Sequence, residues 1–202
     1  MSKEIFAFVL VMGSLATFSA AVLQPMQVTE NQMVAAALIP LPEPLRIGAG
    51  VVRLDETKHP QIIRKSANGM VCIADPPGDA VFDVRCYEEH FIEVVYRAFQ
   101  LGYTVSGPKV EEEIKAGQLH LSNDVTAGYR CLGSASGYNP STNTISSEID
   151  CWESIHFPFR TARQIGLPEM NDISADLRRR VPYVMSSGLY WAHVMIEHPK
   201  KN

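Results

Sequence analysis

Four cysteines, all well downstream of an apolar N-terminal segment, limit how this chain can fold. They are Cys72, Cys86, Cys131 and Cys151. The N-terminal segment has Lys3 near its start, a continuous apolar run over residues 5–11, and small residues up to Ala21. That order is typical of a secretory signal peptide, with Ser19 and Ala21 at the two positions that signal peptidase recognises. The cysteines are therefore expected in an oxidising compartment, where they form disulfides instead of remaining thiols.

The same segment has a second interpretation, an uncleaved membrane anchor, because residues 5–23 approach the length of a spanning helix, about 20 apolar residues. Small and polar residues from Gly13 onwards dilute it, however, and no basic cluster follows. We therefore expect cleavage after Ala21, which makes residues 1–21 a signal peptide and residues 22–202 a single exported domain. After cleavage the protein would be periplasmic or secreted, with no attachment to a membrane.

The four cysteines allow three sets of pairs, and the sequence alone does not select among them. The hairpin pattern of the surrounding chain favours pairing in chain order. Cys72 would then bond to Cys86 across one loop. Cys131 would bond to Cys151 across the next. Structural zinc sites usually bring cysteines in pairs separated by about two to four residues, whereas 13, 44 and 19 residues intervene here, so neither a metal nor a cofactor is predicted.

Apolar periodicity predicts an α+β fold built on an antiparallel sheet, because strands come first, helices follow and strands return. The first strands are expected to form a β-meander over about residues 47–87, with Asn68-Gly69 as a tight hairpin turn. Helices are expected over about residues 88–119, and C-terminal strands complete the sheet. Further expectations are a helix capped by Thr29 and Gln32, strands at 129–132, 144–159, 181–185 and 191–197, and a short helix at 161–166.

The formal net charge of −4 argues against one class of partner. Nucleic-acid-binding domains carry a clustered basic face. The main basic run of this chain, residues 178–180, is better explained as the solvated end of a helix, where cations are favourable. No nucleic acid is expected as a partner, and the sequence does not identify any other.

His193 is the one residue that we single out for chemistry. It lies in the apolar segment 192–196, and an imidazole there can act as a general base or a metal ligand because its ordinary pKa lies near working pH. The alternative is a half-buried histidine with a backbone partner, which we favour because no second ligand is identifiable along the chain. No catalytic, metal-binding or cofactor-binding residue is therefore assigned, and His193 stays the single candidate.

Two further stretches of the sequence have the composition of sites. Cys86, Glu89 and His90 would come together on a helix, as a thiolate–imidazole pair or a ligand set. That arrangement requires a free Cys86 and conflicts with the expected disulfide. Residues 133–143 are rich in Gly, Ser and Asn and carry Tyr138, a composition typical of an adaptable recognition loop.

Four short motifs occur together in this chain. The first two are N-G-M-V-C-I-A-D-P at residues 68–76 and C-Y at 86–87; the others are P-Y-V-M at 182–185 and W-A-H-V-M at 191–195. As a set they resemble a family of uncharacterised exported bacterial proteins. The resemblance implies export and a shared fold, and it implies no activity, because the family has no assigned function. This chain departs from the family pattern at residues 186–188, where Ser-Ser-Gly replaces Asp-Pro-Gly, and in its second cysteine pair.

These observations favour an exported, disulfide-stapled protein with a binding or structural role and no catalysis. The alternative is a small exported hydrolase or metal-dependent enzyme that uses His193 with a carboxylate from another strand. The first carboxylates to consider are Glu148, Asp150 and Glu153. Metal analysis of the mature protein, followed by activity profiling of His193→Ala, separates the two hypotheses.

Cleavage after Ala21 predicts a mature protein that begins at Val22. The reason is the pair Ser19 and Ala21, which presents small side chains to the peptidase just after the apolar run. Intact-mass measurement and N-terminal sequencing of protein exported by its native host check this. Recovery of a membrane-retained protein that still starts at Met1 would show that the segment is an anchor.

Overall fold

The computed structural model describes residues 29–75, 79–104 and 106–197. The predicted signal peptide, residues 1–21, and the predicted mature N-terminus at Val22 lie outside these residues. Within the described ranges, no helix combines the length and the apolar content that a membrane span requires.

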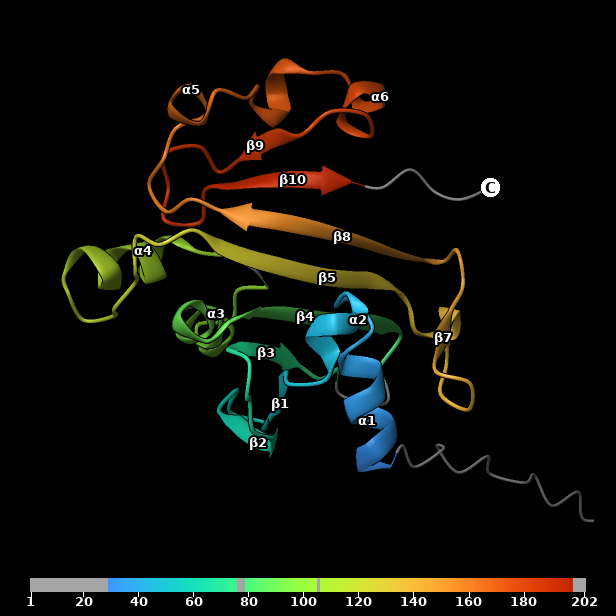
Figure 1. The fold of residues 1–202 in the computed structure, drawn as a ribbon. Helices are drawn as coiled ribbons and strands as arrows, with labels where there is room; N and C mark the ends of the chain where they lie inside the picture. The colour runs from blue at the N-terminus through green and yellow to red at the C-terminus, as the bar shows by residue number, and fades with distance from the viewer. Residues whose placement is uncertain (1–28, 76–78, 105, 198–202) are drawn as a thin grey trace, which may run out of the picture.

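An eight-stranded sheet runs through the described chain in the order β2-β1-β3-β4-β5-β8-β10-β9 (Figure 1). All neighbouring pairs are antiparallel except β1 and β3. The strands are β1 Gly50–Leu54, β2 Pro60–Arg64, β3 Met70–Ile73, β4 Val81–Glu88, β5 Thr126–Ser134, β8 Ile149–His156, β9 Tyr183–Met185 and β10 His193–Glu197. A separate small hairpin pairs β6 Tyr138–Asn139 with β7 Thr144–Ile145.

Local sequence signals predict helices after Thr29, over residues 88–119 and at 161–166, and helices form in these places. The short helix Glu43–Arg46 lies outside these predictions. The capping box of the first helix is confirmed. Thr29 Oγ1 accepts from the backbone N–H of Gln32 at 3.3 Å, and Gln32 Oε1 accepts from the backbone N–H of Thr29 at 2.9 Å. The helices expected over residues 88–119 are confirmed as two, of which the second ends early, before Gly117 with its φ of 70°. The helices are α1 Glu30–Ala37, α2 Glu43–Arg46, α3 Glu89–Gln100, α4 Pro108–Lys115, α5 Ala162–Ile165 and α6 Ala175–Arg178.

The predicted meander over residues 47–87 is wrong in one respect, because β2 does not pair with β3. β2 lies at the edge of the sheet, and β3 pairs with β1 in parallel, with Gly50 beside Val71. The connection after β2 passes the start of β1, where Ala67 N donates to the Gly48 carbonyl at 2.7 Å. Asn68-Gly69 forms a turn, but its asparagine bonds elsewhere in the chain instead of closing a hairpin between β2 and β3.

The later strands match the expectations more closely. The strand predicted at 129–132 is the middle of the longer β5, and the one predicted at 144–159 is divided into β7 and β8. Both C-terminal strands form, as β9 and β10, and they complete the far edge of the sheet. The coarse prediction, an α+β fold on a mostly antiparallel sheet, is confirmed.

Successive side chains of a strand point to opposite faces of the sheet, so apolar residues pack into a core on each face. On one face Tyr87 and Val71 pack against α3, whose buried positions include Phe91. On the opposite face Cys86 and Cys72 pack against α1. The apolar residues of α3 recur at helical spacing, so this helix offers one apolar face to the sheet.

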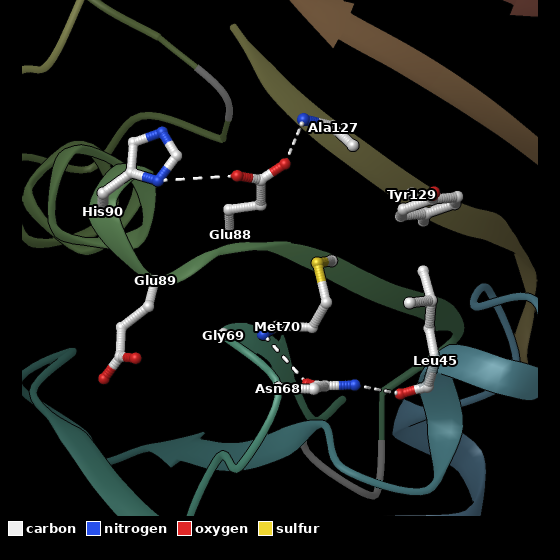
Figure 2. A pocket seen from close by; sticks show the side chains of 9 residues that line it. All are labelled: Leu45, Asn68, Gly69, Met70, Glu88, Glu89, His90, Ala127 and Tyr129. Atoms are coloured by element: carbon white, nitrogen blue, oxygen red, sulfur yellow. Dashed lines mark hydrogen bonds and ion pairs between the residues drawn. The ribbon is translucent and has the colours of Figure 1, made fainter. Parts of the chain in front are cut away.

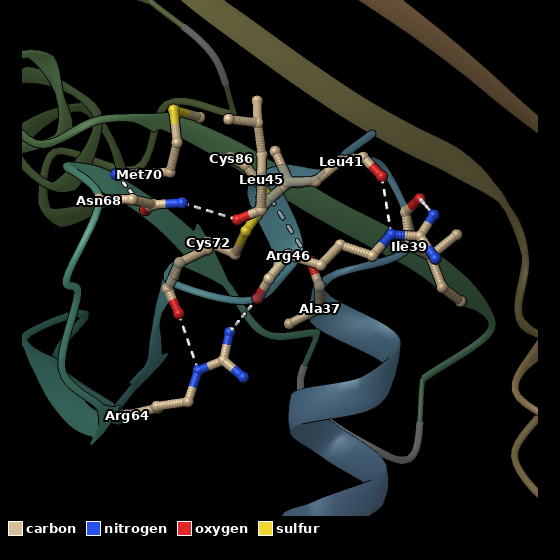
Figure 3. The surroundings of a disulfide bond; sticks show 11 residues. Ala37, Ile39, Leu41, Leu45, Arg46, Arg64, Asn68, Met70, Cys72 and Cys86 are labelled. Atoms are coloured by element: carbon tan, nitrogen blue, oxygen red, sulfur yellow. Dashed lines mark hydrogen bonds between the residues drawn. A yellow bond between two sulfur atoms is a disulfide. The ribbon is translucent and has the colours of Figure 1, made fainter. Parts of the chain in front are cut away.

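Both disulfides join residues that lie directly opposite each other on adjacent strands. The structure bonds Cys72 of β3 to Cys86 of β4 (Figure 3). It also bonds Cys131 of β5 to Cys151 of β8. No free cysteine occurs among the described residues. This is the pairing in chain order that the hairpin pattern favours.

Side chains from the β2–β3 region hold the short helix α2 against the sheet (Figure 3). Asn68 Nδ2 donates to the Leu45 carbonyl at 2.8 Å, and Arg64 Nη2 donates to the Arg46 carbonyl at 2.9 Å. A helix of four residues cannot satisfy these carbonyls itself, so the two side chains replace the missing partners. Leu45 is thereby fixed against the apolar cluster that contains Met70.

The buried position of the first disulfide predicts a measurable contribution to stability. The double variant Cys72→Ala/Cys86→Ala should lower the free energy of unfolding by about 2–5 kcal/mol, because the unfolded chain regains the freedom that the bond removes. Urea unfolding of the oxidised proteins measures the difference. Cys131→Ala/Cys151→Ala is the matched variant, and in reducing buffer the gap from wild type should shrink for both. Equal stability of variant and wild type under oxidising conditions would contradict the prediction.

Candidate functional site

A cavity of about 650 Å³ opens beside the point where β4 passes into α3 (Figure 2). Ligand cavities in proteins usually measure about 300–1,000 Å³, so its size suits a small molecule. Its walls come from α2, the turn before β3, the β4–α3 junction and β5. The lining residues are Leu45, Asn68, Gly69, Met70, Glu88, Glu89, His90, Ala127 and Tyr129.

The register of the sheet brings three of these side chains together on one face. Met70 of β3 lies directly opposite Glu88 of β4, and Tyr129 of β5 lies opposite Cys86, two residues earlier on β4. Residues two apart point to the same face of a strand, so Met70, Glu88 and Tyr129 share the α1 side of the sheet. Burial raises the pKa of Tyr129, and the carboxylates of Glu153 and Glu88 add to this effect. The Tyr129 hydroxyl is therefore protonated at neutral pH.

The Glu88 carboxylate is held in place from two sides. Its Oε1 accepts a hydrogen bond from the Ala127 amide at 3.2 Å, and its Oε2 lies 3.6 Å from His90 Nδ1 (Figure 2). His90 Nε2 lies 2.7 Å from Thr126 Oγ1. Because Nδ1 faces a carboxylate, we place the imidazole proton on Nδ1, and the Thr126 hydroxyl then donates to Nε2. His90 thus has a hydrogen bond at Nε2 and a longer electrostatic contact at Nδ1.

A hydroxyl, an imidazole and a carboxylate in this order form the arrangement that activates nucleophiles in hydrolases. Thr126, however, is completely buried and does not line the cavity. A ligand in the cavity therefore meets Glu88 and His90 but cannot reach the Thr126 hydroxyl. The row of groups fixes the position of Glu88; it does not present a nucleophile.

The sequence-based hypothesis of a Cys86–His90 pair is wrong, and the structure shows why. Cys86 belongs to β4, which stays extended as far as Glu88, so the four-residue spacing does not bring its sulfur to the imidazole. The sulfur is bonded to Cys72. His90 does take part in the cavity, but its neighbours Glu88 and Thr126 were not singled out from the sequence. The run Glu88-Glu89-His90 at a strand-to-helix junction was the available signal for Glu88.

His193 lies away from this cavity, on β10. Its side chain is buried, its Nδ1 donates to the Trp191 carbonyl at 2.7 Å, and its ring stacks on His156 with the centroids 4.9 Å apart. β8 does share a sheet with β10, as expected, but Glu153 lies opposite Ile196, three residues along from His193. Across the described ranges, no three His, Cys, Asp or Glu side chains are placed to hold a metal ion together.

His156, which stacks on His193, is the most deeply buried ionisable side chain described on the α3 side of the sheet. Its Nε2 lies 3.1 Å from Ser154 Oγ, and its Nδ1 has no hydrogen-bond partner within the described part of the chain. Gly128 lies close by, where a Cβ atom would approach Ser154 Oγ to 2.6 Å. Burial holds the pKa of His156 well below its ordinary value, and His193 contributes in the same direction. Burial also lowers the pKa of His193, although its bond to Trp191 opposes this.

A further polar cluster lies on β4 and β5, on the α3 side of the sheet. Arg130 donates from Nε and Nη2 to the Asp83 carboxylate, both at 2.8 Å, and the buried Arg85 donates to the same carboxylate and to the Thr104 carbonyl. Burial opposes the ionisation of Asp83, but these hydrogen bonds outweigh it and hold its pKa below the ordinary value. Burial raises the pKa of the nearby Asp75 to about 7.

The buried histidines predict a loss of stability towards acid. Between pH 7 and pH 5 the unfolded chain binds a proton at His156 that the folded protein does not, so the free energy of unfolding falls as the pH falls, by at most about 1.4 kcal/mol per pH unit for each such histidine. His156→Gln should flatten this slope. Urea unfolding at closely spaced pH values measures it.

The difference in pH slope between wild type and His156→Gln isolates the contribution of His156. Asp75 acts in the opposite direction over the same range, because its raised pKa keeps a proton in the folded state that the unfolded chain releases. The difference between wild type and His156→Gln removes that contribution. His120→Gln, at an exposed histidine, is the matched control and should keep the wild-type slope. Parallel profiles for wild type and His156→Gln would show that His156 takes up its proton without unfolding.

The comparisons with known proteins supply no relative for this chain. No protein-family model, no curated protein and no solved structure matches it. Neither a fold family nor an activity can therefore be carried over from another protein. A function for this chain therefore follows from the chemistry of its own cavity, which Glu88, Met70 and Tyr129 help to line.

Proposed function

We propose that this protein is an exported, disulfide-stapled binding domain that holds a small ligand in the cavity beside the β4–α3 junction, without catalysis. The observation that carries the proposal is the position of Glu88. Its carboxylate is fixed at the cavity wall by the Ala127 amide and the His90 imidazole, next to the apolar side chain of Met70. Fixed polar groups among apolar walls are the usual composition of a small-molecule site.

Two features of the cavity favour binding over catalysis. Both nitrogens of His90 already face partners, so the imidazole has no free position from which to take a proton from a substrate. The one hydroxyl in line with it, that of Thr126, is enclosed by protein. A ligand can therefore be recognised in this cavity, but none of the described residues presents an activated nucleophile to it.

The alternative function, a hydrolase or metal-dependent enzyme that uses His193, has less support. The imidazole of His193 is buried, stacked on His156 and bonded to a backbone carbonyl, and it does not line the cavity. An enzyme that used it would need an opening of the sheet region around β10 before a substrate could enter.

The export part of the proposal rests on two independent features. The N-terminal sequence has the order of regions of a signal peptide, and two disulfides suit an oxidising compartment. We propose on this basis that the mature protein works in the periplasm or outside the cell. Membership of the uncharacterised exported family that the four motifs resemble is part of the same proposal.

A cavity-filling variant tests the binding site. A small-molecule fragment set screened by protein NMR should give ligands whose shifts centre on the amides of Gly69 and Ala127. Ala127→Phe should abolish their binding, because the added ring occupies the cavity without changing its charge. Ala116→Phe, at an exposed alanine of α4's end, is the matched control and should leave binding unchanged. Fragment binding that survives Ala127→Phe in a folded variant would contradict the proposal.

A further inference from the structure

We infer that the ligand of this cavity is a small organic cation, an ammonium group carried on an apolar body. The inference rests on the proposed binding function and names the chemical class that the cavity selects. The first observation is the charge of the residues that line the cavity. Glu88 and Glu89 supply two carboxylates, and no lysine or arginine is among the described residues that line the cavity. An anionic ligand would meet repulsion here, whereas a cation would be attracted.

The Glu88 carboxylate retains hydrogen-bonding capacity toward a ligand. An ionised carboxylate offers about four acceptor positions, and the Ala127 amide uses one of them. Its other oxygen lies 3.6 Å from His90 Nδ1, which is longer than a hydrogen bond. An ammonium group with N–H donors can bind there without displacing the Ala127 amide. Because Glu88 is already held in place, little conformational freedom is lost when the ligand binds.

The remaining walls suit the rest of such a ligand. The half-buried ring of Tyr129 presents an aromatic surface, on which a cation is attracted by the ring quadrupole. The thioether of Met70 and the side chain of Leu45 add soft, apolar contacts (Figure 2). Figure 2 shows Met70 between Glu88 and Leu45, with Tyr129 facing them from β5. A ligand spanning this space therefore meets a carboxylate at one end and apolar surface at the other.

A bare metal ion fits the same lining less well. The cavity of about 650 Å³ is far larger than an ion, and the described residues place no group of three metal-binding side chains together. The imidazole among the described lining residues, that of His90, has Nε2 in a hydrogen bond with Thr126 Oγ1 and Nδ1 3.6 Å from Glu88 Oε2. The charge of the cavity therefore points to an organic cation whose body fills the volume.

Three probes of nearly equal shape test the inference: 3-phenylpropylammonium, 3-phenylpropanol and 3-phenylpropionate. Titration of the mature protein, followed by NMR, should give a dissociation constant for the ammonium about tenfold lower than for the neutral alcohol, with the carboxylate weakest. Glu88→Gln should raise the ammonium constant about tenfold and leave the alcohol constant unchanged. Glu56→Gln, at an exposed glutamate between β1 and β2 that does not line the cavity, is the matched control and should change binding by less than about threefold.

A second variant, Tyr129→Leu, tests the inference even if Glu88→Gln does not fold. Tyr129→Leu removes the aromatic ring and should weaken the ammonium more than the alcohol, and the melting temperature verifies that each variant is folded. Equal binding of the ammonium and the alcohol, abolished by Ala127→Phe, would overturn the inference and leave the binding function intact. The absence of binding by all three probes at millimolar concentration, or binding unaffected by Ala127→Phe, would overturn both.

Discussion

The register of β4 against its two neighbours is the constraint on which the rest of the structure depends. With β3 on one side, it sets Cys72 opposite Cys86, and the next pair along sets Met70 opposite Glu88. A shift by one residue would turn every side chain of β4 to the other face, since successive residues alternate. The disulfide and the cavity would then be lost together. The covalent bond within the core and the polar group at the surface are thus consequences of one alignment.

The junction of β4 and α3 distributes its side chains between two environments. Tyr87 and Phe91 enter the core beneath α3, while Glu88 lies at the cavity and His90 reaches Thr126 on β5. Side chains on the same face recur every two residues along a strand but every three to four residues along a helix, and the chain changes from strand to helix here. Neighbouring residues therefore diverge at this point. That divergence explains how one short run supplies both a hydrophobic core and a fixed carboxylate.

The same sheet contains an unusual polar interior on its α3 side. His156 of β8 lies between Thr126 of β5 and His193 of β10, one residue from each of three adjacent strands. An unpartnered buried nitrogen such as His156 Nδ1 costs free energy. Contacts with the rings of Phe91 and Trp191 surround it. This polar interior and the Glu88 cavity therefore lie on opposite faces of the sheet.

Local signals in the sequence determined the elements whose stability is local. The Thr29 and Gln32 capping box and the apolar spacing of α3 depend on residues close together in the chain. The hairpin pattern favoured the cysteine pairing that forms but did not select it. Asn68-Gly69 misled because β2 pairs with β1 and not with β3, so these residues close no hairpin, and the asparagine side chain reaches the distant Leu45 carbonyl. Only the tertiary structure decided the parallel pairing of β1 with β3 and the meeting of residues from α2, β3, β4, α3 and β5 in the cavity. Such long-range contacts depend on the alignment of whole strands and on the packing of α2, and no short stretch of sequence specifies them.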